Sequence, residues 1–232
     1  MLKKYSKYGL IIIVILMAAV VSYFYLTEFY LPKQEEEKTV YAAEDFPNAL
    51  QMMEEEILQM SLDDLNKQYR KLAEGDEYVY IRWINIGILK KRLGDIMGAE
   101  KAWLKAAEYN PDQSLAYGNL ADLYQFDLEE NKKSEEYYQK VLSMPTYSYN
   151  YYLGLATLYR YRITEKTGLI EGLMLEGAER VPAEVENYYM YLANYFAEGP
   201  NNEGGNNIEK ARYYTQETLK INPDLKDQLP DL

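Results

Sequence analysis

The stretch Tyr80–Pro111, which reads YIRWINIGILKKRLGDIMGAEKAWLKAAEYNP, decides the fold of this chain. In its first half, Trp83, Ile86 and Gly87 lie on one face of a predicted helix, and the small Gly87 allows a neighbouring helix to approach closely. The Gly94-Asp95 pair then supplies a helix stop followed by a helix cap. The first half therefore predicts one helix that ends in a tight turn.

The second half of the stretch predicts a second helix. Ala99, Trp103 and Ala106 recur at i, i+4 and i+7, which places them on a single apolar stripe. Pro111 ends the helix, because proline has no N–H to donate and its ring clashes with the preceding turn. Two short helices that each carry one apolar face are expected to pack on each other as an antiparallel pair.

The same spacing of aromatic, small and proline positions returns three more times along the chain. The four segments are residues 80–113, 114–148, 149–185 and 186–223. The expected core residues are Trp83, Gly87, Ala99, Trp103 and Ala106 in the first segment, Tyr117 and Ala121 in the second, Tyr152 and Ala156 in the third, and Tyr189, Ala193 and Ala211 in the fourth. The recurrence of a small residue one turn after each aromatic predicts four structurally equivalent helix pairs.

This pattern resembles the tetratricopeptide repeat, whose signature W-x2-L-G-x2-Y…A-x3-F…P recurs about every 34 residues. The resemblance implies an all-α fold, in which antiparallel helix pairs stack into an α-solenoid with a right-handed superhelical path. It also implies a scaffold that binds other proteins, since these repeats usually serve that role.

The resemblance further implies a concave groove lined by the first helix of each pair. Mapped onto this chain, the groove residues are Ile84, Ile88, Lys91, Asp122, Gln125, Asn150, Arg160, Asn187 and Asn194. Asparagine side chains can hydrogen-bond an extended peptide, and the two cations could meet a carboxylate. The apolar end, from Ile81 to Ile88, either takes an aliphatic anchor or packs on the preceding hairpin. Ile84 and Ile88 replace the Lys and Asn that open the carboxylate clamp of chaperone-tail-binding relatives, so that ligand is not expected.

The N-terminus predicts a membrane anchor. Tyr8 to Leu26 is apolar apart from Gly9 and Ser22 and would span about 28 Å as a helix, close to the thickness of a bilayer core. We assign residues 1–7 to a basic cytoplasmic tail, 8–30 to the single transmembrane helix and 31–44 to an acidic tether. The lysines before the apolar run place the repeats outside the cytoplasm by the positive-inside rule. A cleaved signal peptide is the alternative.

Residues 45–79 are expected to be helical but match the repeat pattern poorly. Asp45 is expected to cap a first helix, with Leu50, Met53, Ile57 and Met60 on its buried face. Ser61-x-x-Asp64 resembles a capping box that begins a second helix, with Leu62, Leu65, Tyr69 and Leu72 on one face. Three interpretations stay open: a degenerate repeat, a hairpin that covers the end of the stack, or a methionine-rich surface that adapts to a partner.

Three segments depart from the pattern. Residues 164–168 are an insertion between helices, and the Gly- and Asn-rich residues 199–207 predict a long loop, for which calcium binding is the alternative. Residues 224–232 form a short polar tail, which leaves the last helix as an exposed contact surface.

Composition argues against catalysis and against nucleic-acid binding. The chain has no His and no Cys, which removes histidine bases, thiol nucleophiles and most metal sites. Its net charge is −12, whereas nucleic-acid binding needs basic patches. The 26 tyrosines exceed what the repeats require and serve either in packing or in recognition.

The sequence thus predicts a non-enzymatic scaffold or adaptor in an envelope-associated complex, anchored in the cytoplasmic membrane with its repeats periplasmic or at the cell surface. Its expected partners are proteins that bind a peptide segment or helix in the groove, and no cofactor or metal is expected. The alternatives are a self-assembling surface protein and an accessory subunit of an envelope enzyme.

Overall fold

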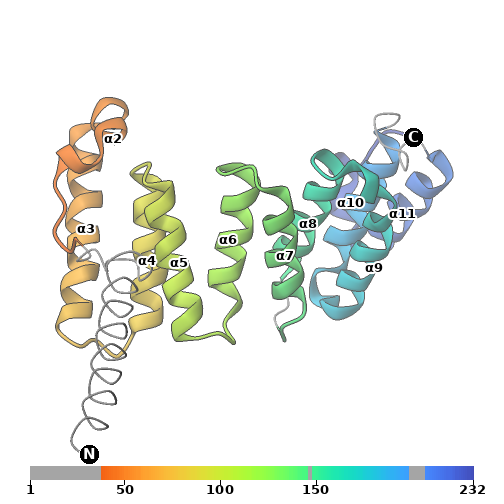
Figure 1. The fold of residues 1–232 in the computed structure, drawn as a ribbon. Helices are drawn as coiled ribbons and strands as arrows, with labels where there is room; N and C mark the ends of the chain where they lie inside the picture. The colour runs from red at the N-terminus through yellow and green to blue at the C-terminus, as the bar shows by residue number, and fades with distance from the viewer. Residues whose placement is uncertain (1–37, 146–147, 199–206) are drawn as a thin grey trace, which may run out of the picture. The chain divides into compact units, whose positions relative to one another are not determined.

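A computed structural model describes residues 38–145, 148–198 and 207–232, and within these ranges every regular element is a helix (Figure 1). The all-α prediction is therefore confirmed for this part of the chain. The α-helices are α2 Pro47–Met52, α3 Glu55–Ala73, α4 Val79–Arg92, α5 Ile96–Tyr109, α6 Ser114–Phe126, α7 Asn131–Leu142, α8 Tyr149–Tyr161, α9 Ile170–Arg180, α10 Val185–Ala197 and α11 Ile208–Ile221. Short 3-10 helices are η2 Ala43–Asp45, η3 Thr164–Leu169, η4 Pro182–Glu184 and η5 Pro223–Gln228.

The helices of Tyr41–Leu232, which form one compact unit, pack in the order of the chain. Each helix from α4 to α10 contacts the helix before it and the helix after it, and Figure 1 shows neighbours running in opposite directions. The pairs α4–α5, α6–α7, α8–α9 and α10–α11 coincide with the four predicted segments, except that α4 and α10 each begin one residue earlier, at Val79 and Val185. The succession of antiparallel pairs is what brings the first helices of successive pairs near one another.

The predicted anchor, residues 8–30, and the basic tail, residues 1–7, lie outside the described residues. Among the residues that the structure does describe, we find no helix with the length and apolar character that crossing a membrane requires.

The first pair is locked by a tryptophan that lies against a glycine. The indole of Trp103 on α5 covers Gly87 on α4 so closely that a methyl group built on the glycine would come within 2.2 Å of the indole Nε1. The same nitrogen donates a hydrogen bond to the Ile84 carbonyl at 3.2 Å. Gly87 therefore allows a close approach within its own pair, as the pattern predicted.

The turn of this pair also confirms the prediction. Gly94 has a φ of +81°, a left-handed conformation that glycine adopts without the steric penalty of a side chain. Asp95 then caps α5, because its carboxylate accepts a hydrogen bond from the Gly98 N–H at 2.8 Å.

The predicted core residues lie in three apolar clusters that follow one another along the unit. Gly87, Ala99, Trp103, Ala106, Tyr117, Ala121, Tyr152, Ala156, Ala193 and Ala211 are buried. Trp83 and Tyr189 are half-buried and pack against the clusters. The recurring positions of the sequence pattern thus mark the interior of the helix stack.

A second recurring feature joins each pair to the next and was not predicted. The Tyr124 hydroxyl on α6 donates to the Glu100 carboxylate on α5, and the Lys133 ammonium lies 4.8 Å from the centre of the Tyr124 ring. The same set of an acid, a ring and a lysine returns as Glu135, Tyr159 and Lys166, and again as Glu171, Phe196 and Lys210. In the last set the hydroxyl comes from Tyr214, 2.8 Å from Glu171, since Phe196 has none.

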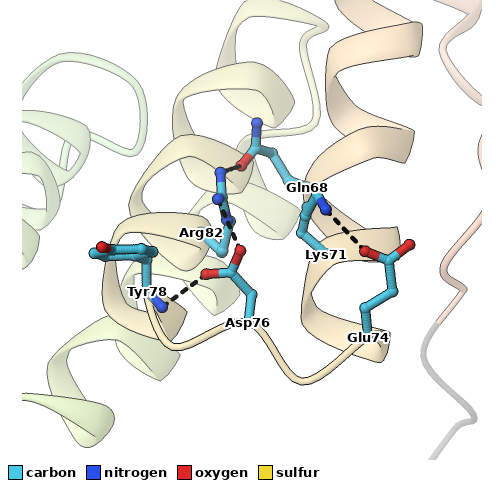
Figure 2. Close-up of polar contacts among 6 residues, drawn as sticks. All are labelled: Gln68, Lys71, Glu74, Asp76, Tyr78 and Arg82. Carbon is cyan, nitrogen blue, oxygen red and sulfur yellow. Dashed lines mark hydrogen bonds and ion pairs between the residues drawn. The ribbon is translucent and has the colours of Figure 1, made fainter.

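A polar junction fixes the hairpin α2–α3 to the first pair (Figure 2). Asp76, in the turn before α4, accepts hydrogen bonds from the Tyr78 N–H at 2.7 Å and from the Arg82 guanidinium at 2.9 Å. Arg82 also donates to Gln68 of α3 at 3.1 Å, so one guanidinium bridges the two helices and the turn. The hydrogen bond from Arg82 is the main reason that the pKa of Asp76 is lowered.

The hairpin differs from the prediction in its caps and in its buried face. Phe46, and not Asp45, precedes α2, and the predicted capping box is wrong because Ser61 lies inside α3 and donates to the Ile57 carbonyl. Leu50, Ile57 and Met60, predicted to be buried, are exposed. The chain breaks its helix at residues 53–54, which rotates the following residues. The face that packs on α4 therefore carries Phe46, Ala49, Leu58, Leu62, Leu65 and Tyr69.

Two later segments are more ordered than predicted. The insertion at 164–168 forms η3, and within the predicted tail η5 covers residues 223–228, followed by Leu229, which packs against the last apolar cluster. On α9 the core residues are Ile170, Met174 and Ala178. The predicted loop at 199–207, with its calcium alternative, lies outside the described residues except for Asn207, which caps α11.

Candidate functional site

The predicted groove residues lie on the first helices of the pairs, α4, α6, α8 and α10, and their accessibility divides them into three groups. Ile88, Asp122 and Asn150 are exposed. Lys91, Arg160, Asn187 and Asn194 are half-buried. Ile84 and Gln125 are buried, at 3 % and 1 % exposure.

The groove assignment of Ile84 and Gln125 is therefore corrected. Ile84 packs in the cluster between α4 and its neighbours, and its carbonyl accepts the Trp103 indole N–H. The Gln125 Oε1 atom lies 2.9 Å from the Tyr138 hydroxyl of α7. Both side chains hold helices together and are not available to a ligand.

The structure brings three of the predicted residues together at the α4–α6 junction. Lys91 of α4 forms an ion pair with Asp127, which directly follows α6. Asp122, one turn earlier, accepts a hydrogen bond from the Tyr138 hydroxyl at 2.5 Å, and Gln125 lies beside the same hydroxyl. Removal of its carboxyl from water raises the pKa of Asp122, against the lowering effects of Tyr138 and of the Lys91 charge. Asp122 is exposed as a residue, although its carboxyl lies beside Tyr138 and is partly withdrawn from water.

Arg160 forms the corresponding ion pair two helix pairs further along. Its guanidinium pairs with Glu198, which directly follows α10, and lies 5.1 Å and 5.3 Å from the ring centres of Tyr161 and Tyr195. Removal of the guanidinium from water lowers the pKa of Arg160, whereas the hydrogen bond to Glu198 and its negative charge raise it. On balance the pKa of Arg160 is raised. Lys91 and Arg160 therefore form ion pairs between neighbouring helix pairs, so both cations already have a carboxylate partner within the chain.

The three predicted asparagines do not form one site. The Asn194 side chain donates to the Met190 carbonyl at 3.0 Å and lies 3.4 Å from the Gln228 carbonyl, so the segment of η5 reaches α10. Asn150 and Asn187 make no side-chain hydrogen bond within the described ranges. The structure thus places Asn150 on α8 and both Asn187 and Asn194 on α10, without a shared contact.

An apolar strip lies on the same helices as the polar group of Lys91 and Asp122. Ile81 and Ile88 are 44 % and 42 % exposed, and because they are seven residues apart they lie on one face of α4. Leu115, in the first turn of α6, is 43 % exposed. The Tyr80 hydroxyl accepts a hydrogen bond from the Ala116 N–H at 3.3 Å, which fixes the start of α4 beside the start of α6.

Sequence reasoning missed Asp127, Glu198 and Tyr138, the residues that engage the predicted cations and acceptors. One signal could have found the first two: each lies 36 or 38 residues after the cation it pairs with, which is about one repeat. Lys91 near the end of α4 meets Asp127 after α6, and Arg160 near the end of α8 meets Glu198 after α10.

The site offers binding contacts and no recognisable reactive group. Within the described part of the chain no group of three or more Asp, Glu, His or Cys side chains is placed to hold a metal ion. The groups of the site are the exposed aliphatic strip, the Asp122 carboxylate and the ion-paired cations Lys91 and Arg160. Comparison with protein-family models and with curated proteins finds no match for this chain.

Proposed function

We propose that this chain is a helical-repeat scaffold that binds a segment of another protein along the first helices of its pairs. The observation that carries the proposal is the exposed strip of Ile81, Ile88 and Leu115, with the exposed residue Asp122 on the same helices. Monomeric surfaces rarely gather aliphatic side chains next to a fixed polar group without a partner, and peptide-binding scaffolds combine these two features.

The repeat character of the scaffold has support from both pattern and packing. Helices pack only in chain order among the strongest contacts, which is how a stacked array is built. The set of Glu100, Tyr124 and Lys133 recurs twice at equivalent places along the stack. We therefore retain the tetratricopeptide-type solenoid, with four helix pairs, as the finer description of the fold.

The chemistry of the site defines the segment that it would bind. An aliphatic side chain of the ligand would pack on Ile81, Ile88 and Leu115, and a backbone N–H or a basic side chain would donate to Asp122. A ligand carboxylate is disfavoured, because Lys91 is already paired with Asp127. This differs from the sequence-based expectation that Lys91 and Arg160 meet a carboxylate.

The experiment is an affinity capture from native membranes, solubilised in mild detergent, with the full chain as bait. The site variant is Ile88→Asp combined with Leu115→Asp. The control is Met97→Asp, since Met97 is 55 % exposed on α5, outside the strip. We expect one partner to be recovered with the wild type and with the control and to be lost with the site variant.

Any other outcome of the affinity capture would contradict this proposal and favour one of three alternatives. Equal recovery of the partner by all three proteins would move the interface away from the strip. Recovery of the bait alone, together with oligomers that grow with concentration in light scattering, would favour a self-assembling protein. Recovery of an active enzyme irrespective of the strip would favour an accessory subunit.

Anchoring of the scaffold in a membrane is part of the same proposal and rests on the sequence of residues 1–30. The apolar run behind Lys3, Lys4 and Lys7 favours a single span with the repeats outside the cytoplasm. Extraction at alkaline pH tests the span, and protease added to intact cells or spheroplasts tests the side on which the repeats lie. Release of the chain by alkali, or protection of the repeats, would contradict this part.

A further inference from the structure

The outer surface of the hairpin α2–α3 is both apolar and acidic, and the proposed function does not use it. Four large apolar side chains are exposed within eleven residues: Leu50 at 52 %, Met52 at 86 %, Ile57 at 47 % and Met60 at 62 %. The opposite face of α3 is filled with core residues that pack on α4. The hairpin therefore exposes apolar side chains in addition to the core residues that α4 covers.

The exposed apolar residues are surrounded by carboxylates. Residues 44–64 contain seven acidic residues and no Lys or Arg. On α3, the neighbours of Met60 three and four positions away are Glu56, Ile57, Asp63 and Asp64, so three of the four are acidic. A methionine at the centre of a ring of carboxylates is a contact point for a side chain that is apolar at its base and cationic at its tip.

The exposed carboxylates between Glu54 and Asp64 form no ion pair in the part of the chain that the structure describes, whereas several carboxylates elsewhere in the unit do. Asp76, Asp127 and Glu198 each form an ion pair with a cation of another helix or turn. None of the exposed acids Glu54, Glu55, Glu56, Asp63 and Asp64 forms an ion pair within the described residues. The polar contact of this group is a hydrogen bond from the Gln59 amide to Asp63 at 2.8 Å. Residues 44–64 of the hairpin thus carry an excess of negative charge, and Lys67, one turn after Asp63 and Asp64, is the first basic residue that follows.

The position of α3 favours a helix as the occupant. Helices α4 to α10 each lie between two others, whereas α3 packs on α4 and otherwise meets only the short elements α2 and η2 among its main contacts. A helix laid on the outer face of α3 would continue the stack by the packing that operates in the rest of the unit. Methionine suits such a surface, because its unbranched, polarisable side chain adjusts to different partners.

We propose that the outer face of α2–α3, formed by Leu50, Met52, Ile57 and Met60 with the surrounding carboxylates, binds a basic amphipathic helix of a partner protein. We call this surface the acidic hairpin face. The apolar side of the partner helix packs on the methionines and Ile57, and its Lys or Arg side chains lie over the carboxylates of α3. This surface is separate from the strip of the proposed function and adds a second binding site to the same chain.

The test measures binding of a fluorescent Leu/Lys helix of about 18 residues, with its leucines at helical spacing, to the purified full chain by anisotropy. A scrambled peptide of the same composition and a Leu/Glu peptide of the same pattern are the ligand controls. We expect micromolar binding of the Leu/Lys helix that weakens about tenfold or more between low salt and about 0.5 M salt, and little binding of either control peptide.

Two pairs of variants separate the hairpin from general acidity. Met52→Gln with Met60→Gln should weaken binding at least tenfold, roughly the effect of losing one buried apolar contact, whereas Met97→Gln on α5 should not change it. Glu56→Gln with Asp63→Asn and Asp64→Asn should weaken binding several-fold at low salt. The matched charge control, Glu108→Gln with Asp112→Asn and Glu179→Gln, removes the same charge from exposed positions elsewhere.

Several results would overturn the proposal. Absence of binding to the wild type, equal binding of the scrambled peptide, or equal loss in both charge variants would each show that the hairpin is not a specific site. Dimers of the chain that the Met52/Met60 variant abolishes would assign the face to a second copy. Binding of the face to neutral phosphatidylcholine vesicles, lost in the same variant, would assign it to lipid. All substituted side chains are exposed, and circular dichroism would verify that each variant remains folded.

Discussion

The contact between Gly87 and Trp103 gives the sharpest prediction about stability. In Gly87→Ala the new methyl group would lie 2.2 Å from the indole Nε1, where a normal contact needs more than 3.4 Å. The indole must therefore move by more than an ångström in a buried site, because Trp103 is only 3 % exposed. The neighbouring helix cannot yield freely, since protein interiors are densely packed.

Three terms set the size of the effect. Overpacking of a core by one methyl group costs about 1–3 kcal/mol. The shift also weakens the hydrogen bond from Trp103 to the Ile84 carbonyl, worth about 1 kcal/mol. Alanine gains about 1 kcal/mol over glycine as a helix former, which offsets part of the loss. The expected result is a loss of about 1–3 kcal/mol in the free energy of unfolding.

Urea unfolding followed by circular dichroism and by tryptophan fluorescence measures this loss. Trp83 and Trp103 are the two tryptophans of the chain, and both lie in the first helix pair, so fluorescence reports the site of the substitution. The control is Gly172→Ala on α9, where a methyl group meets nothing within 4 Å. There the helix-forming gain acts without a clash, and the free energy of unfolding should rise by up to about 1 kcal/mol.

The two substitutions are thus expected to change stability in opposite directions. If Gly87→Ala stabilises the protein as Gly172→Ala does, the indole does not lie over Gly87 and the packing of the first pair described above is wrong. A double variant that also carries Trp103→Phe provides a further check. The smaller ring should reduce the cost of the added methyl group, which gives a coupling of about 1 kcal/mol between the two positions.

Three further outcomes follow from the polar contacts. Lys91→Glu should lower the free energy of unfolding by about 1 kcal/mol, by placing like charges at the α4–α6 junction, and adding Asp127→Lys should restore most of it in the same urea titration. Because Arg82 lowers the pKa of Asp76, the Asp76 carboxylate stabilises the fold above its unfolded pKa of about 4, and this stabilisation is lost as pH falls through the folded pKa. The variant Asp76→Asn should therefore show a smaller loss of stability at acid pH than the wild type. An equal loss in both proteins would refute the contact between Arg82 and Asp76. Burial raises the pKa of Tyr159 to about 12, so the stability that its neutral hydroxyl contributes is complete below pH 10 and is lost as pH rises toward 12. In an alkaline titration followed by absorbance, Tyr159→Phe should show one tyrosine fewer among those that ionise at high pH.

Much of the helical order could be predicted from the sequence. The helices α4 and α5, the positive φ of Gly94 and the cap at Asp95 are fixed by residues close in the chain, so their prediction needs no partner. The same reasoning failed in the hairpin, where the break at residues 53–54 leaves Leu50, Ile57 and Met60 exposed. A change of two residues at a helix boundary rotates everything that follows by about 200°, because successive residues turn by about 100°.

The candidate site was less predictable than the fold. Ile84 stands at a groove position by sequence but is buried, and Lys91 and Arg160 were predicted to be ligand contacts but are ion-paired with Asp127 and Glu198. Each of these outcomes depends on a residue that lies on another helix. Pattern matching assigns a residue to a face of its own helix, but it does not report what the next helix places opposite that face.

The sequence by itself determined that this chain is helical, where most helices begin and end, and that it lacks the histidine and cysteine used in common catalytic sites. Only the tertiary structure decided which apolar and charged side chains remain accessible. The physical reason is range: hydrophobic periodicity and helix caps act over a few residues, whereas the partners of Lys91, Arg160 and Trp103 lie 36, 38 and 19 residues away and meet them only when the helices stack.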